Sequence, residues 1–186
     1  MGLINKIQIA VGNYQLKKEV ARKRDVHSCN WNAASSIGIL YKIDDERSLK
    51  HIKWYMKEIK KRYGQKRIFA LGYLDEKSPA TYLSHGLDQD YIFKKDLNWF
   101  GKPTSKVAGK FIGDKFDLLL DLTEGNCVPL RFTLLRSRAK FKVGKHTAEN
   151  ELACDLLIGV QEDGWNHYME QLDKYIGMIN ASQFNS

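Results

Sequence analysis

The spacing of apolar residues predicts one clear amphipathic helix. Between residues 49 and 63, apolar side chains return every three or four positions, and lysines occupy the other faces. Ser48 is the predicted N-cap, and Gly64 is expected to end the helix. We therefore expect one buried face and one cationic face that is exposed to solvent. The predicted buried stripe consists of Leu49, Ile52, Met56, Ile59 and Tyr63.

Six other stretches are short and apolar, which is typical of strands. The stretch 116–122 is apolar except for two aspartates, as expected of a strand that is covered on both faces. The predicted strands are residues 35–43, 67–73, 91–94, 116–122, 141–143 and 156–160. The other predicted helices are residues 107–112, 128–138 and 165–179.

Strands that alternate with helices are typical of parallel sheets. We expect an α/β fold of three layers, in which a mostly parallel sheet of five or six strands carries helices on both faces. This single domain is expected to span residues 35–186. Before it, residues 1–34 are expected to form a basic N-terminal helix, over residues 1–24, and a connector.

Length and composition agree with one globular domain, since the chain has 186 residues, of which 43% are hydrophobic. No apolar run approaches the roughly 20 residues of a membrane span, and Lys6 interrupts the apolar start of the chain. The expected location is cytoplasmic. Cys29, Cys127 and Cys154 lie far apart, so we expect buried thiols rather than disulfides or a zinc site.

Positive charge is concentrated in particular segments of this chain, whose net charge is +8. Residues 131–145 carry six Lys and Arg and no acid, whereas residues 147–186 carry seven acids and one lysine. Such asymmetry favours an anionic partner, although a solvated basic surface is the simpler alternative. The candidate anion-binding residues are Arg131, Arg136, Arg138, Lys140, Lys142 and Lys145.

Within this basic segment, alternation along the strand places Lys140 and Lys142 on one face. Their ammonium groups are expected to point together, beside the helix end that carries Arg136 and Arg138. Either a bound anion or nearby acids should offset the repulsion between these cations. The acids of the last helix, which include Glu170 and Asp173, are the intramolecular candidates.

Two adjacent aromatic residues, Trp99 and Phe100, lie between lysines that include Lys102. Such a group suits base stacking beside phosphate contacts. The alternative, which we favour, is an aromatic wedge that closes the core.

Acidic residues follow several predicted strands, at the carboxyl edge where parallel sheets bind ligands. They predict a pocket formed by Asp44, Asp75, Asp121, Thr123 and Glu124. Residues of this kind are also ordinary turn formers and helix caps. The sequence has no Gly-rich phosphate loop and no Gly-x-Ser-x-Gly turn. We therefore predict no catalytic residue, no metal and no cofactor.

Several segments resemble an uncharacterised Bacteroidota family, a domain of unknown function. These are Leu-Asn-Trp-Phe-Gly at 97–101, Phe-Asp-Leu-Leu-Leu-Asp-Leu at 116–122, Ser-Arg-Ala-Lys-Phe-Lys-Val-Gly at 137–144, Asp-Leu-Leu-Ile at 155–158, and Gln171, Tyr175, Ile179 and Asn180 in the last helix. The resemblance covers residues 35–180 and implies a small cytosolic α/β protein, without an activity.

A second, local likeness covers residues 116–144. This stretch is similar to part of the N-terminal Rossmann-like domain of lipopolysaccharide heptosyltransferases. Those enzymes bind their sugar nucleotide mainly through a second domain, for which this chain has no room. The likeness therefore implies the fold rather than the activity.

Three functions remain open. The leading one is a non-catalytic binding or adaptor domain whose basic surface meets RNA or a ribonucleoprotein. A small Rossmann-like ligand-binding domain or enzyme that uses the acids at the strand ends is the alternative. A peripheral membrane protein, attached to an anionic membrane surface through residues 1–24, is the third.

Overall fold

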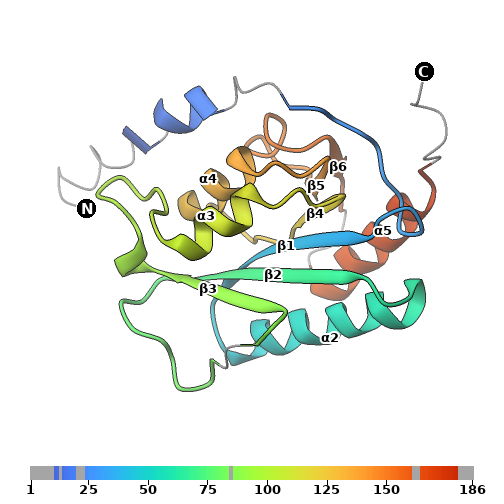
Figure 1. Ribbon diagram of the computed structural model, residues 1–186, viewed down its shortest axis with the longest axis horizontal. Helices are drawn as coiled ribbons and strands as arrows, with labels where there is room; N and C mark the ends of the chain where they lie inside the picture. The colour runs from blue at the N-terminus through green and yellow to red at the C-terminus, as the bar shows by residue number, and fades with distance from the viewer. Residues whose placement is uncertain (1–10, 13, 20–23, 84–85, 161–163, 180–186) are drawn as a thin grey trace.

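The computed structural model describes residues 11–12, 14–19, 24–83, 86–160 and 164–179. Their strands form one six-stranded sheet in the order β3-β2-β1-β4-β5-β6, and each neighbouring pair is parallel (Figure 1). The predicted parallel sheet is thus confirmed. The strands are β1 (Ser36–Ile43), β2 (Arg67–Leu74), β3 (Gln89–Phe93), β4 (Leu118–Asp121), β5 (Phe141–Lys145) and β6 (Leu156–Ile158).

Helices cover both faces of the sheet, so the fold has the three layers that were expected. Figure 1 shows α2 below the sheet and α3 and α4 above it. Buried residues of α5 lie in the same hydrophobic cluster as those of α2, and buried residues of α3 and α4 lie in the other cluster. Within the described part of the chain, no helix combines the length and apolarity needed to cross a bilayer. The helices are α2 (Glu46–Tyr63), α3 (Lys106–Gly113), α4 (Val128–Arg136) and α5 (Trp165–Gly177), with the short 3-10 helix η1 (Lys94–Asp96) after β3.

Helix α2 buries the apolar stripe that its sequence predicts, but it begins earlier. Leu49, Ile52, Met56 and Ile59 are buried in the sheet core. The N-cap is Asp45 rather than Ser48, because an Asp45 carboxylate oxygen accepts the backbone N–H of Ser48 at 2.8 Å. Ser48 is the third helical residue and completes a capping box.

The inner strand β4 lies between β1 and β5, and all four of its residues are buried. This agrees with its apolar sequence. Its amino end is fixed to β1, since the backbone N–H of Asp117 donates to the Ser36 carbonyl oxygen at 3.0 Å. Its carboxyl end contacts the opposite layer, since the Tyr168 hydroxyl donates to the Asp121 carbonyl oxygen at 3.1 Å.

The segment before β1 packs against the domain. Trp31 is 1% exposed and lies in the same core as α2 and α5. Its indole N–H donates to the carbonyl oxygen of Asp173 in α5 at 3.2 Å. Of the predicted N-terminal helix, residues 11–12 and 14–19 are helical, and the remainder up to residue 23 lies outside the described residues.

Candidate functional site

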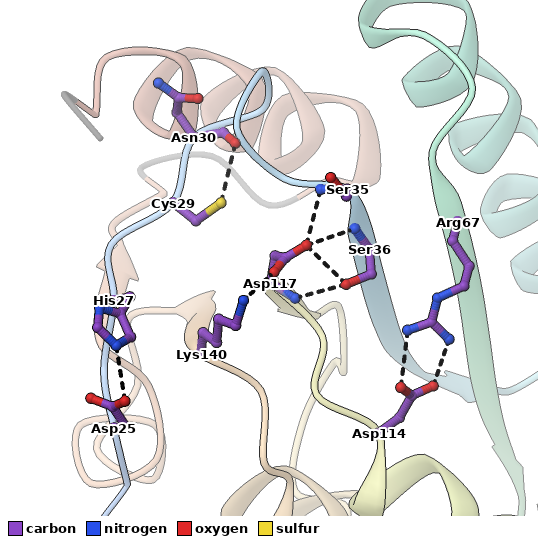
Figure 2. A network of polar contacts seen from close by, with 10 residues as sticks. All are labelled: Asp25, His27, Cys29, Asn30, Ser35, Ser36, Arg67, Asp114, Asp117 and Lys140. Atoms are coloured by element: carbon purple, nitrogen blue, oxygen red, sulfur yellow. Dashed lines mark hydrogen bonds and ion pairs between the residues drawn. The ribbon is translucent and has the colours of Figure 1, made fainter. Parts of the chain in front are cut away.

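A network of polar contacts organises the amino edge of the sheet (Figure 2). The Asp117 carboxylate accepts hydrogen bonds from the backbone N–H groups of Ser35 and Ser36 at 3.0 and 2.9 Å, and from the Lys140 ammonium at 2.8 Å. Burial opposes ionisation of Asp117, but these hydrogen bonds outweigh it and lower its pKa. Lys140, a predicted anion ligand, is thus held by an acid of its own chain.

A hollow of about 830 Å³, which we call the basic groove, lies beside this network at the C-terminal end of α4. Six of its lining residues are cationic, and two, Glu19 and Asp25, are acidic. Cations therefore outnumber acids among the residues that line the groove. The cationic residues are Arg24, Lys115, Arg136, Arg138, Lys140 and Lys142.

Lys142 lines the basic groove together with Lys140, at the end of α4 that carries Arg136 and Arg138, but it is buried and not exposed. Its side chain is only 2% exposed. The ammonium donates to the carbonyl oxygens of Leu134 and Leu135 at 2.5 and 3.2 Å. These carbonyls belong to the last turn of α4, which has no intrahelical donors for them. Burial lowers the pKa of Lys142 to about 8. The Lys142 ammonium therefore binds the end of α4, which covers this side of β5.

The six predicted cations separate into two groups, since four line the basic groove and two, Arg131 and Lys145, line a hollow at the opposite edge. The predicted compensating acids were also wrong. Asp173 pairs with Arg62 and accepts from the Tyr55 hydroxyl, so it serves α2. Glu170 is exposed and forms no ion pair with a described residue.

The acids that hold the groove come from distant parts of the chain. Glu19 lies 3.7 Å from the Arg136 guanidinium, and Asp155 pairs with Arg24. Arg24 also donates to the carbonyl oxygens of Ala139 and Lys140, both at 2.9 Å. Sequence reasoning missed Arg24 as a groove residue, because nothing local links residue 24 to residues 139–155.

Two cations of the basic groove differ from the other four in having no partner among the described residues. Arg138 and Lys115 are exposed, and neither side chain forms a hydrogen bond or ion pair with any residue that the structure describes. Arg138 was predicted from the basic segment. Lys115 was not, because it stands alone between α3 and β4 in the sequence. These two side chains are therefore the exposed cations of the groove that have no partner among the described residues.

The aromatic turn between η1 and α3 has one exposed and one packed ring. The ring centroids of Phe100 and Phe132 of α4 lie 6.0 Å apart, so Phe100 packs against α4 as the wedge interpretation predicts. Trp99 is 59% exposed and touches Phe100 edge-on at 5.3 Å, so the wedge interpretation does not hold for it. Lys102 lies 3.9 Å from Glu19. Trp99 therefore presents a free aromatic surface.

The acids at the strand ends do not form one cluster. Asp121, Thr123 and Glu124 line a hollow of about 420 Å³. Asp75 lines another, of about 350 Å³, and Asp44 is exposed and paired with Lys42. Among the described residues, no group of three or more His, Cys, Asp or Glu side chains is placed to hold a metal ion.

A protein-family model matches residues 9–179, which is most of the chain. The chain belongs to a family of unknown function, DUF6913. No curated protein and no solved structure matches it. The resemblance to an uncharacterised domain is confirmed at this level, but neither a Bacteroidota group nor a likeness to heptosyltransferases is shown.

Membership of DUF6913 assigns no chemistry, so the side chains must indicate what the sites do. The three thiols are free, and two of them, Cys29 and Cys127, are buried. Burial raises the pKa of Cys127 to about 12, which keeps this thiol protonated and a poor nucleophile.

Proposed function

We propose that this protein is a binding domain that takes a single-stranded segment of RNA, free or in a ribonucleoprotein, into the basic groove. The observation that carries the proposal is the exposure of Arg138 and Lys115 in a concave, cation-lined surface, with no partner among the described residues. Two free cations beside four further ones repel each other, and phosphate groups relieve this repulsion.

The remaining cations give the groove a fixed shape. Arg24 and Lys140 are held by carboxylates, and Lys142 by helix carbonyls, so that the walls are ordered before a ligand arrives. Ordered walls reduce the entropy lost on binding. The concave form favours a single strand over a bilayer, because a flat membrane surface does not reach the floor of a groove.

The test is a pair of charge-reversed variants with equal change in net charge. Arg138→Glu with Lys115→Glu alters the groove and breaks no hydrogen bond or ion pair with a residue that the structure describes. Lys57→Glu with Lys61→Glu alters two exposed lysines of α2, in the other helix layer, and serves as the control. Fluorescence anisotropy with a labelled mixed-sequence single-stranded RNA, at several salt concentrations, gives affinity and salt dependence.

We expect the groove variant to bind about tenfold more weakly or worse, and the α2 variant to bind almost as the wild type does. The slope of log K against log salt should fall by about 1.4 in the groove variant, since each lost phosphate contact removes about 0.7. Equal losses in both variants, or an unchanged groove variant, would show that RNA does not use the groove. Cosedimentation with phosphatidylserine vesicles, without RNA binding, would also overturn the proposal.

A further inference from the structure

A second site lies at the opposite, carboxyl edge of the sheet. The strand order reverses there, since β1 pairs with β2 on one side and with β4 on the other. Ligands of open parallel sheets bind in the crevice beyond the strand ends at such a reversal. Two hollows lie at this edge, and both are lined in part by residues at the start of α4. Cys127 and Arg131 line one hollow, and Val128 and Pro129 line the other. We call them the polar hollow, beyond β4 and β5, and the aromatic hollow, beyond β2 and β3.

Arg131 is the feature of the polar hollow that points to a ligand. Its side chain is 15% exposed, and Glu149 lies 4.0 Å from it, at the outer limit of an ion pair. Burial raises the pKa of the Asp121 carboxyl in the same hollow, and the Arg131 guanidinium opposes this shift. A guanidinium has five N–H donors. No described residue accepts a hydrogen bond from this side chain. An anion in the hollow would satisfy it.

The floor of the polar hollow is built closely around two polar side chains. Asp121 is buried, and one of its carboxylate oxygens accepts the backbone N–H of Thr123 at 3.2 Å. Asn150 donates to the carbonyl oxygen of Lys145 at 3.0 Å. A side chain at Gly144 would begin 2.8 Å from the Cys154 sulfur and 2.9 Å from the Asn150 amide nitrogen, so glycine lets these side chains pack against β5. The floor offers oxygen acceptors to ligand hydroxyl groups.

The aromatic hollow supplies the complementary chemistry. Trp99 stands at it with most of its surface exposed, beside Phe100 and Tyr73. The Tyr73 hydroxyl donates to Asp75 at 2.7 Å, and Lys94 lies 3.3 Å from the same carboxylate, so the polar groups around the rings are paired with each other. What remains for a ligand is an aromatic face, on which a planar ring can stack.

We infer that the carboxyl edge binds a nucleoside monophosphate or a closely similar compound, with its phosphate at Arg131 in the polar hollow and its base against Trp99 in the aromatic hollow. Cys127 lines the polar hollow and the adjacent Val128 lines the aromatic hollow, so the two hollows adjoin the same turn of α4 and one ligand would use both. Its ribose hydroxyl groups would then face the acceptors on the floor.

The experiment measures binding of AMP, UMP, adenosine and inorganic phosphate by calorimetry and by the shift in Tm. Arg131→Gln and Trp99→Ala are the test variants. Arg47→Gln and Trp54→Ala are matched controls on exposed positions of α2, where Trp54 is 48% exposed. The Arg138→Glu, Lys115→Glu variant reports separately on the basic groove, so that the two proposals succeed or fail independently.

We expect AMP or UMP to bind the wild type, the α2 controls and the groove variant alike. Arg131→Gln should weaken both nucleotide and phosphate by about tenfold or more, which corresponds to one lost charged hydrogen-bonding group. Trp99→Ala should weaken nucleotide and adenosine by about tenfold and leave phosphate unchanged. Because Trp99 is exposed, this variant folds even where Arg131→Gln does not.

Three results would overturn the inference. The first is that neither nucleotide binds the folded wild type. The second is that nucleotide binds no better than inorganic phosphate, which would remove the role of the aromatic hollow. The third is binding that the groove variant abolishes and the Arg131 and Trp99 variants retain.

Discussion

Trp31 lies flat against Tyr63, with ring centroids 5.0 Å apart and ring planes 8° apart. The contact joins the segment before β1 to the last turn of α2. Because Trp31 is almost fully buried, Trp31→Ala leaves a large cavity in the core. We expect the free energy of unfolding to fall by about 3–5 kcal/mol, measured by urea denaturation.

Trp99→Ala is the matched control for this loss, since it removes the same side chain from an exposed position. Its effect on stability should stay within about 0.5 kcal/mol. A loss as small for Trp31→Ala would mean that the segment before β1 detaches from the core in solution.

The two faces of α2 lead to a second prediction. Ile52 is fully buried, and Lys57, on the other side of the helix, is exposed. Ile52→Ala should therefore cost about 2–5 kcal/mol of stability, and Lys57→Ala less than about 0.5 kcal/mol. Chemical denaturation measures both. Similar losses for the two variants would contradict the placement of the helix.

The third prediction concerns the pH dependence that Lys142 confers. Its pKa is about 8 in the folded protein and near 10.5 when unfolded. Between these values the unfolded chain keeps a proton that the folded chain has released, so raising the pH favours the folded state. The stability of the wild type relative to Lys142→Met should rise by up to about 3 kcal/mol across this window.

Denaturation of both proteins at several pH values between 8 and 10.5 measures this difference. The subtraction removes the contribution of the tyrosines and of the other lysines. Parallel stability profiles for the two proteins would show that the Lys142 ammonium is solvated rather than buried against α4.

The local patterns of the sequence predict the layers and the sheet well. The apolar stripe of α2 and the apolar run of β4 are reliable signals, because each pattern depends only on how one element packs against its nearest neighbours. Alternation also places Lys142 correctly opposite Phe141 on β5. It does not tell whether that face meets water or the end of a helix, because that depends on where α4 stops.

The contacts that shape the sites come from pairs far apart in the sequence. Arg24 meets Asp155, and Lys140 meets Asp117, although no periodicity links the members of either pair. Trp31 likewise stands alone in a polar segment, so no periodic pattern predicts that it is buried. What the sequence does indicate is which residue types are available, as with Arg131 and Trp99, and not which edge of the sheet each one occupies.

The central position of β1 affects how the chain is synthesised as well as how it is packed. Its Ile37 pairs with Ile68 early in the sequence and with Leu118 much later. As the chain leaves the ribosome, β1, α2, β2 and β3 emerge before β4, so one long apolar edge stays open until residue 121 is available. Contacts so distant in sequence slow folding, and open edges promote aggregation. A fragment that ends before β4 should therefore be recovered from cells as insoluble protein.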